Sequence, residues 1–196
     1  MTKENRIFLG LVHYPIYNKN SEMVATSVTN LDIHDISRAA ATYDLNKYFI
    51  IHPHPSQRQL VTELLAYWQE GYGAEYNPDR KEALARLALV DSLKAAVEEI
   101  KAQYGGPVYT IVTDARTFPR SISYRGLRQK LWENSDCNYL LLFGTGYGLA
   151  AEIMEEADYV LAPVLGRGPY NHLSVRSAAA IIIDRLLGPA WWNEEE

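Results

Sequence analysis

The feature that most limits the fold of this chain is an alternation between short strand-like runs and longer helix-like runs. The strand-like runs are rich in β-branched and aromatic residues, and we expect them at residues 6–15, 47–53, 107–114, 138–144 and 158–164. The helix-like runs carry apolar residues at helical spacing, and we expect them at about 32–43, 56–71, 77–106, 149–157 and 173–188, with another ending near residue 134. Alternation of this kind predicts an α/β fold, a mostly parallel sheet with helices on both faces.

The longest predicted helix has clear signals at both ends. Asn77 is a suitable N-cap residue and Pro78 fits the first helical position, while Gly105 and Gly106 form a stop signal. We therefore expect one continuous helix over residues 77–106. The turn-forming residues 14–24 predict a loop after the first strand.

Composition is that of a globular protein with one domain. The chain has 196 residues, of which 47% are hydrophobic, and we expect a single domain over residues 1–196. No apolar run approaches the ~20 residues of a membrane helix, and the first residues lack the features of a signal peptide. Cys137 is the only cysteine, which excludes an intramolecular disulfide and favours the cytoplasm.

The charges are unevenly distributed. The formal net charge is −5, which argues against nucleic-acid binding by the molecule as a whole. One segment nevertheless holds a single acid, Asp114, among the bases Arg116, Arg120, Arg125, Arg128 and Lys130. Such a segment suits a polyanion such as RNA. The alternative is a solvated helix face with no binding role.

Unusual loops follow the last three predicted strands. They read TDARTFPR, GTGYG and APVLGRGPYNH. In open α/β sheets, ligands bind beyond the carboxyl ends of the strands, so this half of the chain is expected to hold the functional site. GTGYG is too short for the G-x-G-x-x-G fingerprint and lacks the Gly-Lys-Ser/Thr of a P-loop. Its glycines either permit a sharp turn or expose backbone groups that can bind the edge of an adenine.

The C-terminal quarter resembles a known enzyme family. The segments LLLFGTGYGLA and YVLAPVLGRGPYNHLSVRSAAAIIIDRLL, within residues 139–187, resemble the signature of SPOUT-class RNA methyltransferases, close to the bacterial tRNA guanine-N1 methyltransferase group. TNLDIHDISRAAATYDL resembles the helix in which the class often carries an arginine near the substrate. That class commonly has Asn-x-Gly before this arginine, whereas this chain has Asp32 and His34.

The resemblance implies an S-adenosylmethionine-dependent RNA methyltransferase with a C-terminal trefoil knot, acting on tRNA or rRNA as a homodimer packed through helices of the knot. The apolar residues 178–183 suit that interface or a buried core helix equally well. The residues that the resemblance implies for the cofactor are Thr113, Asp114, Ala115, Phe143, Gly144, Thr145, Gly146, Gly148, Leu161, Ala162, Pro163, Val164, Leu173 and Ser174.

Methyl transfer requires an oriented nucleophile and in some cases a general base. The catalytic candidates are Asp114, His172 and Arg38, and the alternatives are a strand-end cap for Asp114 and a pocket-wall residue for His172. Candidates for gripping the RNA are Arg116, Arg120, Arg125 and Arg176. Arg176 and Arg185 alternatively pair with acids across a dimer.

His52 and His54 lie two residues apart and resemble the start of a metal site. No third ligand is evident near them, so we expect no metal and a pocket-lining role instead. Two rival functions stay open. One is a SPOUT module that binds S-adenosylmethionine or RNA without catalysis. The other is a nucleotide-binding α/β protein unrelated to this class.

Overall fold

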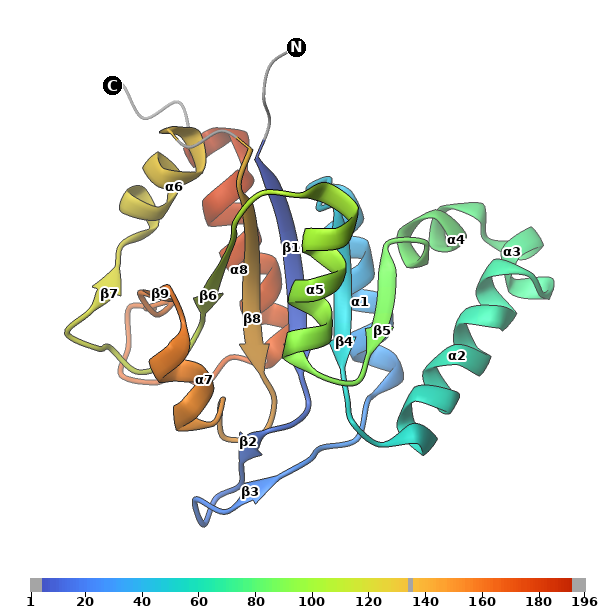
Figure 1. Ribbon diagram of the computed structural model, residues 1–196, viewed down its shortest axis with the longest axis horizontal. Helices are drawn as coiled ribbons and strands as arrows, with labels where there is room; N and C mark the ends of the chain where they lie inside the picture. The colour runs from blue at the N-terminus through green and yellow to red at the C-terminus, as the bar shows by residue number, and fades with distance from the viewer. Residues whose placement is uncertain (1–4, 134–135, 192–196) are drawn as a thin grey trace.

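A seven-stranded parallel sheet forms the centre of the molecule, which we describe from a computed structural model over residues 5–133 and 136–191 (Figure 1). The order of strands across the sheet is β5-β4-β1-β8-β6-β9-β7. In chain order these strands are β1 (Arg6–Val12), β4 (Lys47–Ile51), β5 (Leu87–Val90), β6 (Val108–Val112), β7 (Ser121–Ile122), β8 (Asn138–Gly144) and β9 (Tyr159–Leu161). The predicted α/β class is confirmed.

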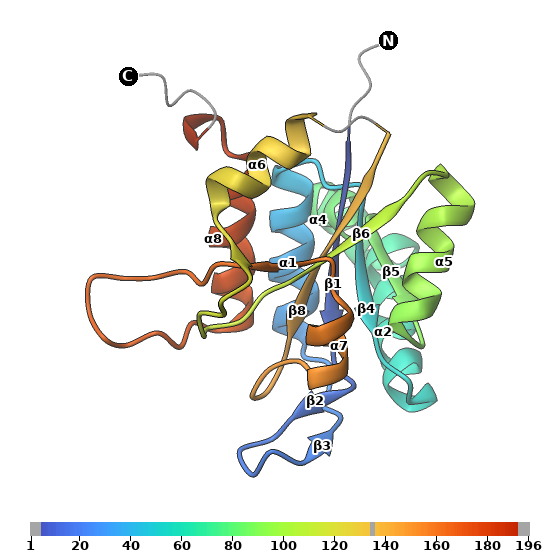
Figure 2. The same ribbon diagram turned by 60° about the vertical axis from the view of Figure 1, so that its left-hand side comes forward.

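Helices cover both faces of this sheet. They are α1 (Asn30–Thr42), α2 (Pro55–Gln69), α3 (Tyr72–Tyr76), α4 (Pro78–Leu84), α5 (Leu93–Tyr104), α6 (Tyr124–Glu133), α7 (Ala151–Glu156) and α8 (Val175–Leu187), followed by the 3-10 turn η1 (Pro189–Trp191). Figure 2 shows α1 and α8 on one side of the sheet and α5 on the other.

The two faces bury separate apolar cores because side chains alternate along each strand. In β8, Tyr139, Leu141 and Phe143 face the core that also contains α1, α6 and α8. Leu140 and Leu142 face the opposite core, which contains α5 and α7. β8 is therefore apolar or aromatic from Tyr139 to Phe143, as expected for a central strand of a parallel sheet.

The prediction of one continuous helix over residues 77–106 is wrong. This segment forms α4, then the edge strand β5, then α5. The end signals were correct, since the Asn77 side chain accepts the Arg80 N–H at 3.0 Å and α5 ends at Gly105. The sequence pattern did not reveal the break between α4 and α5, because the alanine and leucine residues around β5 favour helices. In the fold these residues gain parallel pairing with β4, and Ser92 caps a new helix by accepting the Ala95 N–H.

Two further elements differ from expectation. Residues 14–24 hold an antiparallel hairpin of β2 (Ile16–Tyr17) and β3 (Met23–Val24), which projects from the carboxyl-end edge of the sheet (Figure 1). α1 begins at Asn30 with Thr29 as its cap. The predicted end of a helix near residue 134 lies outside the described residues, which follow α6 to Glu133.

β6 and β7 follow one another along the chain, but β9 lies between them in the sheet. The C-terminal knot stays a prediction. Across the described parts of the chain, each helix is too short or too polar to span a membrane.

Candidate functional site

A cavity of about 910 Å³ opens at the carboxyl ends of β6 and β8. Ligand sites in proteins typically occupy roughly 300–1,000 Å³, so its size suits a small organic molecule. Its walls come from five stretches of chain: the β2–β3 hairpin with Ser27, the start of α1, residues 113–116, residues 143–148, and Val164 with residues 171–175 and the first turns of α8.

The glycine loop, residues 144–150, forms one wall of the cavity. Its backbone is hydrogen-bonded to the segment that follows β1. The Tyr17 N–H donates to the Gly148 carbonyl at 3.0 Å, and the Tyr147 N–H donates to the Tyr17 carbonyl at 2.9 Å. Gly146 has φ 59°, and a Cβ there would lie 3.0 Å from the Tyr17 oxygen. The glycine therefore permits both the left-handed turn and the close approach of two backbones.

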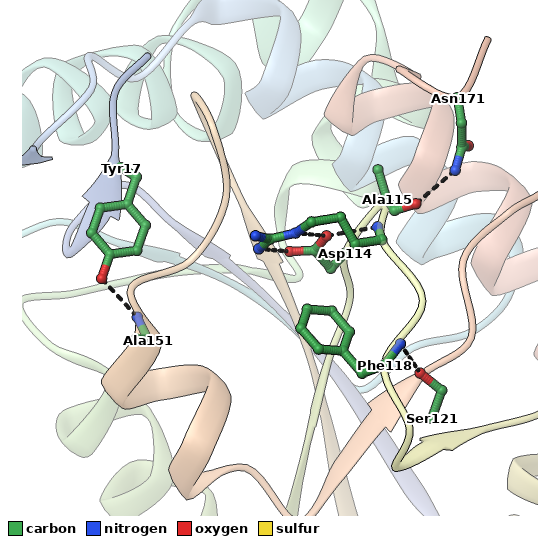
Figure 3. Close-up of polar contacts among 8 residues, drawn as sticks. Tyr17, Asp114, Ala115, Phe118, Ser121, Ala151 and Asn171 are labelled. Carbon is green, nitrogen blue, oxygen red and sulfur yellow. Dashed lines mark hydrogen bonds and ion pairs between the residues drawn. The ribbon is translucent and has the colours of Figure 1, made fainter. Parts of the chain in front are cut away.

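Asp114 follows β6 and lies beside the glycine loop, since a Cβ at Gly148 would be 3.6 Å from its Oδ2; Figure 3 shows Asp114 between Tyr17 and Asn171. Its carboxylate accepts from Arg116 three times: from N–H at 2.7 Å, Nε at 2.9 Å and Nη2 at 2.8 Å. This pairing raises the pKa of Arg116 and fills three of the roughly four acceptor positions of the Asp114 carboxylate. The geometry favours the strand-end cap over a general base.

The last loop is tied to the loop after β6. Asn171 donates from Nδ2 to the Ala115 carbonyl at 2.7 Å (Figure 3). Ser174 then caps α8 by accepting the Ser177 N–H. His172 lies between them, is exposed, lines the cavity and packs edge-on against Tyr170.

Most residues expected at a cofactor pocket do line this cavity. The exceptions are Leu161, Ala162 and Pro163. Leu161 is buried in the core beneath the sheet, and the Ala162 N–H donates to the Ile122 carbonyl at 2.9 Å. Leu161 and Ala162 hold β9 against β7, while Val164 is the first residue after β9 to reach the cavity.

The predicted arginines occupy different places. Arg116 lines the cavity with its guanidinium mostly exposed. Arg120 donates to the carbonyl oxygens of Met154 and Ala157, so it ties its loop to the end of α7. Arg125 is exposed on α6, and Arg38 is exposed on α1; neither lines the cavity. The structure therefore does not bring Arg38 together with Asp114 and His172.

Arg176 joins the starts of α8 and α1. Its Nη1 lies 3.5 Å from Asp32 Oδ1, and its Nε lies 3.3 Å from Asp35 Oδ2. It does not line the cavity, but Asp32 does. The predicted arginine thus pairs with two carboxylates within its own chain.

The sequence analysis missed a wall formed by the hairpin and the start of α1. Asp32 is buried, and it accepts a hydrogen bond from the Thr29 hydroxyl at 2.5 Å. The Thr29-x-x-Asp32 spacing is a recognisable capping pattern and was a usable signal. Lys19 and Tyr17 of the hairpin had no such signal, because only the fold brings them to the glycine loop.

The predicted pocket-lining histidines lie beside the cavity but do not line it. His52 is buried and bonded to the Thr26 carbonyl, and His54 donates its N–H to His52 Nδ1. Within residues 5–133 and 136–191, His, Cys, Asp and Glu form no group of three or more suited to a metal ion.

Known proteins resemble this chain in sequence and in fold. A protein from Aquifex aeolicus without an assigned function is 40% identical over 95% of this chain and 90% of its own length. A tRNA (guanine-N(1)-)-methyltransferase from Nitratidesulfovibrio vulgaris is 44% identical over 94% of this chain, which spans only 43% of that relative. The SpoU methyltransferase AviRb from Streptomyces viridochromogenes, solved with AdoMet, has a TM-score of 0.57 at 13% identity, covering 95% of this chain and 58% of AviRb.

The low identity of AviRb restricts that likeness to the fold, which this chain shares with that SpoU methyltransferase. A family model described as SAM-dependent RNA methyltransferase matches residues 6–188. This match covers both the sheet and every wall of the cavity. The chain therefore belongs to the SAM-dependent RNA methyltransferase family.

Proposed function

We propose that this chain binds S-adenosylmethionine in the cavity at the carboxyl ends of β6 and β8 and transfers its methyl group to a nucleotide of tRNA or rRNA. The observation that carries the proposal is the convergence of three loops, after β6, β8 and β9, on one cavity inside the segment that matches the family. The same loops were expected to hold the cofactor from the sequence.

The residues of the cavity fit this cofactor chemically. Val164 and Leu173 supply apolar surface suited to a heterocycle, and the glycine loop brings its backbone to the cavity wall. Asp32 adds a carboxylate to the wall at the start of α1, which suits a ligand with a cationic sulfonium and an ammonium group. When bound, S-adenosylmethionine supplies a methyl group on a positively charged sulfur, open to in-line attack.

The chain's own contribution is to hold the nucleotide in line and to accept a proton. His172 is our candidate for the proton acceptor, because its exposed imidazole lines the cavity whereas Asp114 is bonded to Arg116. Arg116 and Lys19 stand at the exposed rim, where they are suited to RNA phosphates. Tyr147, 68% exposed at the tip of the glycine loop, offers a stacking surface to an unpaired base.

The assembly and location are also proposals. We propose a homodimer formed through α8, whose residues Ser177 and Ala180 are exposed while Ala179 and Ile183 fill the core. A dimer would give the RNA a second basic rim. We place the protein in the cytoplasm, together with its RNA substrates. Light scattering of the purified chain tests the assembly directly.

The proposed activity is tested in two steps. Titration calorimetry with S-adenosylmethionine should show binding, and labelled methyl groups should then enter tRNA, which we test first because the longer relatives are named as tRNA methyltransferases. Binding without transfer to tRNA or rRNA would support the alternative, a module that binds the cofactor without catalysis. Absence of binding at millimolar ligand would overturn both.

A further inference from the structure

We infer that Thr26 is a positioning residue: two buried histidines hold it, and it in turn fixes Thr145 in the glycine loop and the cavity wall that leads into α1. Thr26 lies in the segment between β3 and α1. This inference rests on the proposed function, because the two walls that Thr26 joins are those of the proposed cofactor cavity.

All polar groups of Thr26 are engaged. Its N–H donates to the His13 carbonyl at 3.0 Å, and its carbonyl accepts from His52 Nε2 at 3.0 Å. Its hydroxyl lies 3.1 Å from His13 Nδ1 and 2.6 Å from the Thr145 hydroxyl. His13 and His52 follow β1 and β4, so the ends of two adjacent strands hold one threonine.

The direction of this chain of hydrogen bonds follows from the number of protons. The Val12 carbonyl, 3.2 Å from the Thr145 hydroxyl, can only accept, so we assign the Thr145 proton to this carbonyl and the Thr26 proton to the Thr145 hydroxyl. The Thr26 hydroxyl has then used its single proton and must accept from His13. His13 therefore carries its proton on Nδ1, while Nε2 is a buried acceptor with no hydrogen-bond partner among the described residues.

His52 has the opposite tautomer. Its Nε2 faces a carbonyl and must donate, whereas its Nδ1 accepts the His54 N–H at 3.1 Å. The two rings stack with centroids 5.6 Å apart, and His13 and His52 are 0% and 1% exposed. Burial without a carboxylate partner keeps both imidazoles neutral, so the pattern of donors and acceptors is constant near neutral pH.

Thr26 stands between two walls of the cavity. Thr145 lines the cavity from the glycine loop, while Ser27 and Thr29, one and three residues after Thr26, line it from the segment that leads into α1. A hydroxyl at Thr26 thus sets how the entry to α1 meets the glycine loop. A methyl group in its place would leave the His13 Nδ1–H without an acceptor and the Thr145 oxygen without a donor.

The test compares variants that differ only in the hydroxyl. Thr26→Val keeps the shape and should weaken S-adenosylmethionine binding by about tenfold, because a buried donor loses its partner. Thr26→Ser keeps the hydroxyl and should bind within about twofold of the unmodified chain. Thr145→Val should weaken binding as Thr26→Val does.

The double variant Thr26→Val with Thr145→Val decides the mechanism. If Thr26 acts through Thr145, the double variant should lose no more affinity than either single variant. Losses that multiply, or a Thr26→Val chain that binds as tightly as the unmodified one, would overturn the inference and leave the proposed function intact. A folded unmodified chain that fails to bind S-adenosylmethionine would instead overturn the proposed function, and the inference with it.

A second measurement needs no variant to fold. Nitrogen NMR of the imidazoles in the unmodified chain should find the proton of His13 on Nδ1 and that of His52 on Nε2. A His13 proton on Nε2 would reverse the chain of donors and contradict the inference.

His13→Asn, whose Nδ2 can replace the Nδ1 donor, should retain S-adenosylmethionine binding, whereas His13→Leu should lose it.

Discussion

The buried imidazole of His13 makes the fold sensitive to acid. Burial and the neighbouring His52 lower the pKa of His13 from 6.5 to about 4, and burial also lowers the pKa of His52. In the unfolded chain these imidazoles titrate near 6.5, so between pH 6.5 and 4 the unfolded state binds more protons. The stability is therefore fully present above pH 6.5 and is lost as the pH falls toward 4.

We predict from His13 alone a loss of about 2 kcal/mol of unfolding free energy between pH 7 and pH 5. Urea unfolding at a series of pH values measures it. His13→Asn should flatten the slope above pH 5, where few carboxylates titrate. A variant with an unchanged slope would show that His13 is not the titrating group. Arg58, bonded to the carbonyls of His52 and Pro53, adds positive charge beside the pair and opposes its protonation.

Single arginines of the basic segment also differ in what they do. We predict that Arg120→Met lowers stability by about 1 kcal/mol, because its bonds to the carbonyls at the end of α7 are lost, and leaves RNA affinity unchanged. Arg125→Met, on the exposed face of α6, should weaken RNA binding and keep stability. Urea unfolding and filter binding of labelled tRNA measure the two effects. The opposite pattern would mean that the RNA contacts the α7 side.

At the scale of elements, the glycine loop depends on backbone approach as well as on turn geometry. Gly146 and Gly105 both have left-handed φ, 59° and 66°, but a Cβ at Gly105 meets nothing within 4 Å. Both alanine variants should lose about 1–3 kcal/mol of stability from the unfavourable backbone conformation, because Gly105 also has ψ −174°, a region that only glycine adopts readily. Only Gly146→Ala should also displace the glycine loop away from the Tyr17 backbone and so weaken S-adenosylmethionine binding. Calorimetry with S-adenosylmethionine on both variants checks this prediction. Equal affinities of the two variants would show that the glycine loop is not part of the binding site.

The elements that the sequence predicted well were those with local signals. Residue type alone predicted the strand before Pro15, the turns at Gly144–Gly148 and the start of the helix near Ser174. β5 did not, because its residues suit a helix and only pairing with β4 makes them a strand. The sequence could not separate structural from RNA-binding residues among the bases of the 116–130 segment, because Arg120 and Arg125 differ only in the partners that the fold gives them.

At the scale of the whole molecule, the sequence predicted one part of the cavity wall and missed the rest. The three loops that follow β6, β8 and β9 share one edge of a parallel sheet, so their meeting could be inferred from order alone. The opposite wall could not, because Lys19 and Asp32 lie more than a hundred residues from the glycine loop and carry no motif in common with it. Arg38 was placed by resemblance, and the fold sets it outside the cavity.

The cavity is enclosed by segments from Tyr17 to Ile182, nearly the full length of the described chain. Contacts of such long range form only after the intervening chain has been ordered. During synthesis, a nascent chain that has not yet released α8 from the ribosome lacks one wall and cannot retain a ligand there. Ligand occupancy would accordingly mark completed folding, and saturating cofactor would protect finished molecules selectively against proteolysis.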